Sequence, residues 1–167
     1  MLHEKLTESD VKKIQEEIEN RKLVVRKEAL ESVKEARAHG DLSENFEYKA
    51  AKQYKNQNES RIRYLEKLLK NAQIITDIYE EDQVGLNSVV QLYIEEDDEV
   101  EEYKIVTSIR GSSLNGYISI ESPLGKALLG HRVGEQVHIQ VNAAYGYDAQ
   151  IRSIAKSSEE EDSIRKF

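Results

Sequence analysis

The sequence predicts an α+β protein in which a long antiparallel pair of helices is joined to a small β-sheet domain. Three observations support this prediction. Residues 7–72 follow the helical period without a proline, and residues 90–154 contain stretches in which apolar and polar side chains alternate. Between those stretches, SPLGKALLG carries the start and stop signals of one short helix. At 167 residues the chain is long enough for one domain or two small ones.

The helical half is expected to form a hairpin. The first helix is predicted from Thr7 to Ala38 and the second from about Leu42 to Ala72, with Gly40 supplying the positive φ that commonly ends a helix. Helices this long, joined by so short a turn, must lie antiparallel. About 30 residues in each, at about 1.5 Å per residue, give an arm of about 45 Å.

Each predicted helix has a narrow apolar stripe that the partner helix would cover. The stripe residues are Val11, Ile14, Ile18, Val25 and Ala29 on the first helix and Ala51, Tyr54, Ile62, Leu65, Leu69 and Ala72 on the second. Asn58 interrupts the second stripe, and a polar residue in such a seam usually fixes the register of the two helices. A two-helix arm has no second layer, so much of its surface faces solvent.

The acidic, glycine-containing stretch TDIYEEDQVGLNS breaks the helical period and is expected to be a linker. The hairpin is therefore assigned residues 1–76, the globular domain residues 77–155, and a charged tail residues 156–167. Strands are expected around Val90, Leu92, Ile94, Tyr103, Ile105, Tyr147, Ala149 and Ile151, and in GYISI and QVHIQV, with EEDDEVEE as a turn. The result is a mostly antiparallel sheet packed on one short helix.

Composition excludes several classes of protein. The chain has no cysteine, so disulfides, thiolate nucleophiles and cysteine-ligated zinc are excluded. No apolar run approaches the roughly 18 residues that cross a bilayer, and no secretory signal opens the chain, so we expect a cytoplasmic protein. Residues 1–76 hold 16 of the 24 basic and 14 of the 32 acidic residues, a net charge of +2, whereas the rest carries −10. This asymmetry argues against nucleic-acid binding by the second half.

The turn of the hairpin, AHGDLSEN, places the carboxylates of Asp41 and Glu44 beside one glycine. One interpretation is a capping box, with Asp41 as the N-cap and Glu44 as its reciprocal partner. The other is chemistry at the end of a rod, because carboxylate oxygens are ligands that Mg²⁺ selects, although two carboxylates alone hold it weakly. The basic side chains of the same region, a solvated helix face or a collar for phosphates, are Lys34, Arg37, Lys49, Lys52 and Lys55.

Two segments resemble a known family. EARAHGDLSENFEYKAAKQYKNQNESRIRYLEKLLKNAQII is similar to the coiled-coil segment of bacterial Gre transcript-cleavage factors, and SPLGKALLGHRVGEQVHIQV is similar to their C-terminal domain. The likeness covers nearly the whole chain, to about Ile154, in the same order and spacing.

This resemblance implies a helical hairpin followed by an FKBP-like domain, in a monomer whose partner is bacterial RNA polymerase. The hairpin would enter the secondary channel, where Asp41 and Glu44 help to hold a second Mg²⁺, shared with the polymerase, and orient the attacking water. The polymerase would then cleave the RNA 3′ end of a backtracked complex, so the chain is not itself an enzyme and binds no cofactor alone. The resemblance also implies RNA contacts for Arg37 and Lys52.

For the globular domain, the resemblance places polymerase contacts at Glu121, Ser122 and Pro123. The same serine and proline also fit a purely structural role, with Ser122 as N-cap and Pro123 as the first residue of the short helix, and Gly130 past its end. Both interpretations stay open at these positions.

Several residues depart from the family pattern. Phe46 replaces the usual alanine after the turn, Arg21 replaces an apolar seam residue, and AAYG replaces a Pro-Gly-Gly turn. These departures keep open an alternative, a divergent family member that binds the same channel and inhibits without promoting cleavage. A coiled-coil adaptor unrelated to transcription is disfavoured by the acids set among lysines. A stand-alone nuclease is disfavoured because no cluster of ligands could hold two metals.

Overall fold

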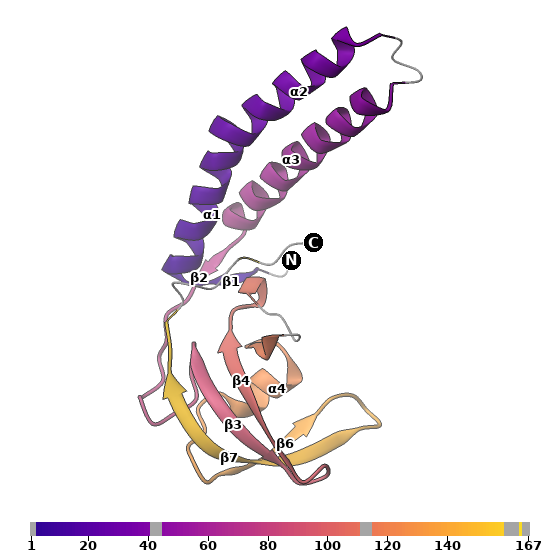
Figure 1. Cartoon of the computed structure of the whole chain (residues 1–167). Helices are drawn as coiled ribbons and strands as arrows, with labels where there is room; N and C mark the ends of the chain where they lie inside the picture. The colour runs from indigo at the N-terminus through magenta and orange to yellow at the C-terminus, as the bar shows by residue number, and fades with distance from the viewer. Residues whose placement is uncertain (1–2, 41–44, 111–114, 159–163, 165–167) are drawn as a thin grey trace. The chain divides into compact units, whose positions relative to one another are not determined.

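The computed structural model describes residues 3–40, 45–110, 115–158 and 164, and the chain divides into two compact units. The first unit, residues 1–4 and 10–72, holds the helical hairpin, and the second, residues 5–9 and 73–167, holds the sheet. Figure 1 shows the antiparallel helices of the hairpin and the curved sheet. The predicted α+β class is confirmed. No helix among the described residues is both long and apolar enough to cross a membrane.

The first arm of the hairpin is one continuous helical path with a change of pitch. It comprises α1 (Glu8–Asn20), a π-helical segment (Arg21–Val25) and α2 (Arg26–Ala38). In the π-helical segment the backbone N–H of Arg26 donates to the carbonyl oxygen of Arg21, five residues earlier. The predicted helix is thus present, but the wider turn within it was not predicted.

Arg21, the first residue of this π-helical segment, faces Asn58 in α3 (Phe46–Lys70), which is only 2% exposed. The guanidinium of Arg21 donates to Asn58 Oδ1 (3.0 Å), and Asn58 Nδ2 donates back to the Arg21 carbonyl oxygen (3.2 Å). The polar seam residue therefore pairs with the arginine that replaces an apolar residue in the facing helix. Because both bonds need one particular pair of positions, they support the predicted role of Asn58 in fixing register.

Charged pairs flank this seam on both sides. Glu17 accepts from Arg21 (2.8 Å) and from Arg61 (3.0 Å), and Arg26 meets Glu59 through two bonds of 2.7 and 2.9 Å. Burial raises the pKa of Glu17, but the hydrogen bonds and charges of the two arginines outweigh it, so the net pKa lies below its usual value.

The apolar stripe differs in part from its prediction. Ile14, Ala29, Ile62 and Leu65 are buried as expected, but Leu68 (6% exposed) is more buried than its predicted neighbour Leu69. Tyr54 is 47% exposed, so its assignment to the buried stripe was wrong. The buried residues of α2 are only alanines, which leave too little apolar surface to cover a phenol ring.

The second unit is built on a five-stranded sheet in the order β5-β4-β3-β7-β6. Within this five-stranded sheet, β4 and β5 pair in parallel and the other neighbouring strands pair antiparallel. The strands are β3 (Ser88–Ile94), β4 (Glu99–Val106), β5 (Tyr117–Ser119), β6 (Gln136–Gln140) and β7 (Gly146–Lys156). The predicted turn EEDDEVEE is too long, because Ile94 already pairs with Glu99 and only residues 95–98 connect the strands.

Alternating residues of these strands form the core. Val90, Leu92, Ile105, Ala149 and Ile151 are fully buried and pack in one cluster that also covers α4 (Pro123–Leu128) through Leu128. The alternation predicted for β3 and β7 is confirmed. At Gly125 an added Cβ would lie 2.1 Å from the carbonyl oxygen of Ser119, so α4 approaches β5 closely enough to require glycine there.

Two short strands escaped prediction. β1 (Lys5–Leu6) pairs in parallel with β2 (Gln73–Ile74), and the Ile75 N–H donates to the Leu6 carbonyl oxygen at 2.8 Å. Leu6 is fully buried. We call this pair the strap, because it joins the residues that precede the first arm of the hairpin to those that follow the second.

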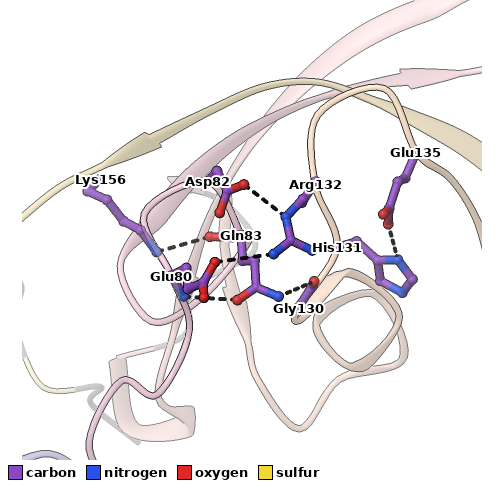
Figure 2. Close-up of polar contacts among 8 residues, drawn as sticks. All are labelled: Glu80, Asp82, Gln83, Gly130, His131, Arg132, Glu135 and Lys156. Carbon is purple, nitrogen blue, oxygen red and sulfur yellow. Dashed lines mark hydrogen bonds and ion pairs between the residues drawn. The ribbon is translucent and has the colours of Figure 1, made fainter.

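The predicted linker is fastened to the second unit rather than free. Figure 2 shows Arg132 donating to Asp82 (2.8 Å) and Glu80 (3.3 Å), and the side chain of Gln83 donating to the Gly130 carbonyl oxygen (3.0 Å). Lys156, at the end of β7, donates to the Gln83 carbonyl oxygen at 3.1 Å. Strand β7 thus continues into the first residue of the expected tail.

Candidate functional site

The turn of the hairpin is organised by Asn45, which is the N-cap of α3. Its Oδ1 accepts from the Tyr48 N–H (3.0 Å), and its Nδ2 donates to the carbonyl oxygen of Ala36, in the last turn of α2 (2.6 Å). One side chain therefore caps one helix and ties it to the other. Gly40, between them, has φ of +127°, as the sequence predicts for the end of the first helix.

The two carboxylates of the turn, Asp41 and Glu44, lie outside the described residues. The capping box predicted for these two residues therefore stays a prediction. Among the described residues, α3 begins at Phe46 with Asn45 as its N-cap, so the helix start predicted near Leu42 was too early.

The flanking helices carry a cluster of cations around one phenol. Arg37 donates to the Tyr48 hydroxyl at 3.4 Å and its guanidinium lies 5.6 Å from the centre of the Tyr48 ring. The pKa of Tyr48 is lowered, first by this hydrogen bond and then by the charges of Lys52, Arg37 and Lys55, although desolvation opposes them. Both predicted RNA-contact residues, Arg37 and Lys52, are exposed, and Arg37 is the one bonded to this phenol.

A second aromatic residue, Phe46, lies two positions before Tyr48 in the same helix. Phe46 is 80% exposed, and the Lys49 ammonium lies 5.7 Å from the centre of its ring. Glu47, the one acid between residues 45 and 58, is bound to His39 at 3.0 Å. The described part of the turn is therefore cationic and aromatic, which is how single-stranded nucleic acids are usually held.

No group of three or more metal-binding side chains occurs in the described ranges. Asp41 and Glu44 are chemically suited to Mg²⁺, but they supply two oxygen donors where Mg²⁺ takes six ligands. A metal at this turn would need further ligands from outside the chain.

The residues predicted for protein contact lie at the start of α4. The side chain of Ser122 accepts from the Gly125 N–H (3.0 Å) and donates to the Ser119 carbonyl oxygen (2.7 Å), so it is occupied as a cap. Pro123 follows at the first helical position and is exposed. Glu121 is exposed and pairs with Lys5 at 3.0 Å. Of the three, Glu121 and Pro123 offer surface to a partner.

The main residues that sequence reasoning underused are Asn45 and Tyr48. The bridge that Asn45 makes between the two helices was not predicted. A signal was present for its capping role, since asparagine directly before a helix-compatible run is a common N-cap pattern. Tyr48 carried no signal, because its importance depends on Arg37, which is eleven residues away in sequence and opposite in the hairpin.

Comparison with known proteins gives concordant matches. Residues 4–74 match the family described as "Transcription elongation factor, N-terminal" and residues 79–156 that described as "Transcription elongation factor, GreA/GreB, C-term". A relative from Thermoanaerobacter pseudethanolicus, named transcription elongation factor GreA, is 47% identical over 139 residues, which cover 83% of this chain and 88% of that one. One from Lachnoclostridium phytofermentans, with the same name, is 40% identical over 154 residues, 92% and 96% of the two chains.

Among solved structures, a crystal structure of GreA factor homolog 1 from Thermus thermophilus is 29% identical to this chain. The match covers 92% of this chain and 99% of that one, with a TM-score of 0.43.

Proposed function

Because the chain belongs to the GreA/GreB family of transcription elongation factors, we propose that it stimulates cleavage of the RNA 3′ end by a backtracked bacterial RNA polymerase. The hairpin enters the secondary channel of the polymerase and brings its turn to the active site. The chain acts as a transcription factor in the cytoplasm, as a monomer, and the polymerase remains the catalyst.

The acids of the turn carry the chemistry in this proposal. Asp41 and Glu44 add two carboxylates to those of the polymerase, and they orient a water molecule for attack on the phosphodiester. The Mg²⁺ that these groups share would lower the pKa of bound water and stabilise charge on the departing oxygen. Since two carboxylates bind Mg²⁺ weakly by themselves, the site works only when both proteins contribute ligands.

The single observation that carries this proposal is the cap made by Asn45. It caps the start of α3 and ties it to the carbonyl oxygen of Ala36, in the last turn of α2. Two helix ends joined in this way are suited to a hairpin whose connecting residues offer carboxylates to another protein. Arg37 and Lys52, exposed beside it, suit an RNA backbone.

Binding at the entrance of the channel falls to the second unit. Glu121 and Pro123, both exposed at the start of α4, are the proposed contacts, with Ser122 holding the helix start in shape. A basic polymerase surface would compete with Lys5 for Glu121, because the existing ion pair is exposed and weak.

The test is a backtracked elongation complex with RNA labelled at its 3′ end. Added protein should release a short 3′ fragment in Mg²⁺. Asp41→Asn and Glu44→Gln should each slow release about tenfold or more, as loss of a metal-binding contact usually does. Both variants should still compete with the unaltered protein for polymerase. Absence of fragment at saturating protein would refute the proposal.

The exposure of Phe46 favours a second candidate, an inhibitor that fills the channel without promoting cleavage. An 80% exposed ring at the turn adds bulk where the family has alanine. This candidate predicts slower nucleotide addition on complexes that have not backtracked. Cleavage that depends on Asp41 would exclude it.

A further inference from the structure

The feature that the proposed function leaves unexplained is the exposed ring of Phe46. It is the first residue of α3, directly after the cap, and 80% of its surface faces solvent. Exposing a phenyl ring to this extent forgoes the free energy of burial. Its only described ring contact is with Lys49, one turn along the helix, whose ammonium lies 5.7 Å from the ring centre. That spacing is typical of a cation–π pair.

The charge around the ring indicates what it binds. Five lysines and arginines occur in residues 34–40 and 45–58, on either side of the turn: Lys34, Arg37, Lys49, Lys52 and Lys55. The one acid of residues 45–58 is bound to His39. An apolar pocket on a protein would call for apolar neighbours, whereas the helical turn that follows this ring reads Glu-Tyr-Lys.

An aromatic face beside several cations is suited to a single-stranded nucleic acid. The phosphates are attracted by Lys and Arg, while an unpaired base stacks on the ring. We propose that Phe46, with Lys49 beside it, is a stacking site for an unpaired base near the 3′ end of single-stranded RNA. This inference rests on the proposed function, since it is the polymerase that would deliver such an end to the turn.

Stacking gives Phe46 a positioning role that the acids cannot fill. A base held against the ring limits the ways in which its phosphodiester can lie near Asp41 and Glu44. Because every base has a π face, the site tolerates any sequence, but purines should bind better than pyrimidines through their larger area. The affinity attributable to one stacked base corresponds to a factor of about five to about 150.

The experiment uses 2-aminopurine as the 3′-terminal base of the RNA in a backtracked complex, with Mg²⁺ chelated so that no cleavage occurs. Stacking on an aromatic ring changes the fluorescence of this base. The unaltered protein should change the signal at saturation. Phe46→Leu, which keeps an apolar side chain but removes the π face, should abolish the change, and Phe46→Trp should retain it.

The matched control is Tyr64→Leu. Tyr64 is exposed on α3, lies 5.6 Å from the Arg61 guanidinium, and is 18 residues from Phe46, which is five helical turns on the same face and about 27 Å away. Tyr64→Leu should produce the same change in 2-aminopurine fluorescence as the unaltered protein. Polymerase binding is measured in parallel by competition, and cleavage in Mg²⁺ is measured separately.

The outcomes separate the two proposals. If the protein binds polymerase and promotes cleavage but leaves the fluorescence unchanged, or if Phe46→Leu keeps the full change, the stacking site is refuted and the proposed function stands. If Phe46→Leu weakens polymerase binding without a fluorescence effect, the ring contacts protein and the inference is wrong. If the unaltered protein does not bind polymerase, both proposals fall.

Discussion

Replacement of Asn45 should weaken the hairpin by an amount that the structure allows us to divide between two bonds. The side chain caps α3 through the Tyr48 N–H (3.0 Å) and joins α2 through the Ala36 carbonyl oxygen (2.6 Å). Loss of an N-cap costs about 1 kcal/mol, and loss of one such hydrogen bond about 1 kcal/mol more. Asn45→Ala should therefore lower the free energy of unfolding of the hairpin by about 2 kcal/mol. Asn45→Ser, which can cap but is too short to reach Ala36, should lower it by about 1 kcal/mol.

Urea denaturation followed by circular dichroism at the helical minimum measures this change. The signal reports mainly on the hairpin, because α1, α2 and α3 contain 13, 13 and 25 residues against 6 in α4. Asn56→Ala, at an exposed position of the same helix, is the control and should leave the free energy within about 0.5 kcal/mol. The division between the two bonds is wrong if Asn45→Ala changes the free energy of unfolding by less than that margin. It is also wrong if Asn45→Ser lowers this free energy as much as Asn45→Ala does.

Two further predictions concern the seam. Asn58→Leu should cost about 1–3 kcal/mol, because it leaves the Arg21 guanidinium beside an apolar group. The double variant with Arg21→Met should recover most of that loss in a double-mutant cycle, and additive losses would contradict the pairing. Acid should also weaken the hairpin through Glu17. Since its folded pKa lies below the usual 4.5, its contribution is present above that value and is lost as pH falls through the folded pKa. Urea midpoints measured in this range should depend less on pH in Glu17→Gln, and an unchanged pH dependence would exclude Glu17 as a source.

The sequence was informative wherever a pattern was both local and periodic. The alternation of Val90, Leu92 and Ile94 predicted β3, and serine before proline predicted the start of α4. The helical period predicted two long helices, and one polar interruption, Asn58, predicted a register device. These signals depend on neighbours within a few residues, so one sequence is enough to find them.

Features that depend on distant pairs could not be predicted in this way. The π-helical segment begins at Arg21, which bonds to Asn58, a residue 37 positions away. The strap consists of two-residue strands, which are too short to show a periodic pattern. The stretch expected to be a linker accepts hydrogen bonds from Arg132 and Lys156, which lie far along the chain. At the turn, only the geometry shows that Asn45 is the N-cap of α3.

The strap determines which fragments of this protein can fold and when its second unit can be completed during synthesis. Leu6, with no exposed surface, precedes the hairpin in the chain, yet it belongs to the unit formed by residues 5–9 and 73–167. A fragment that starts at Gln73 would lack this leucine and leave the edge of β2 unpaired. To isolate the sheet unit, residues 5–9 must therefore be supplied as a separate peptide or grafted on by circular permutation. During synthesis, residues 5–9 are made before the hairpin and β2 is made after it. Strand β1 can therefore pair with β2 only once the hairpin has been synthesised.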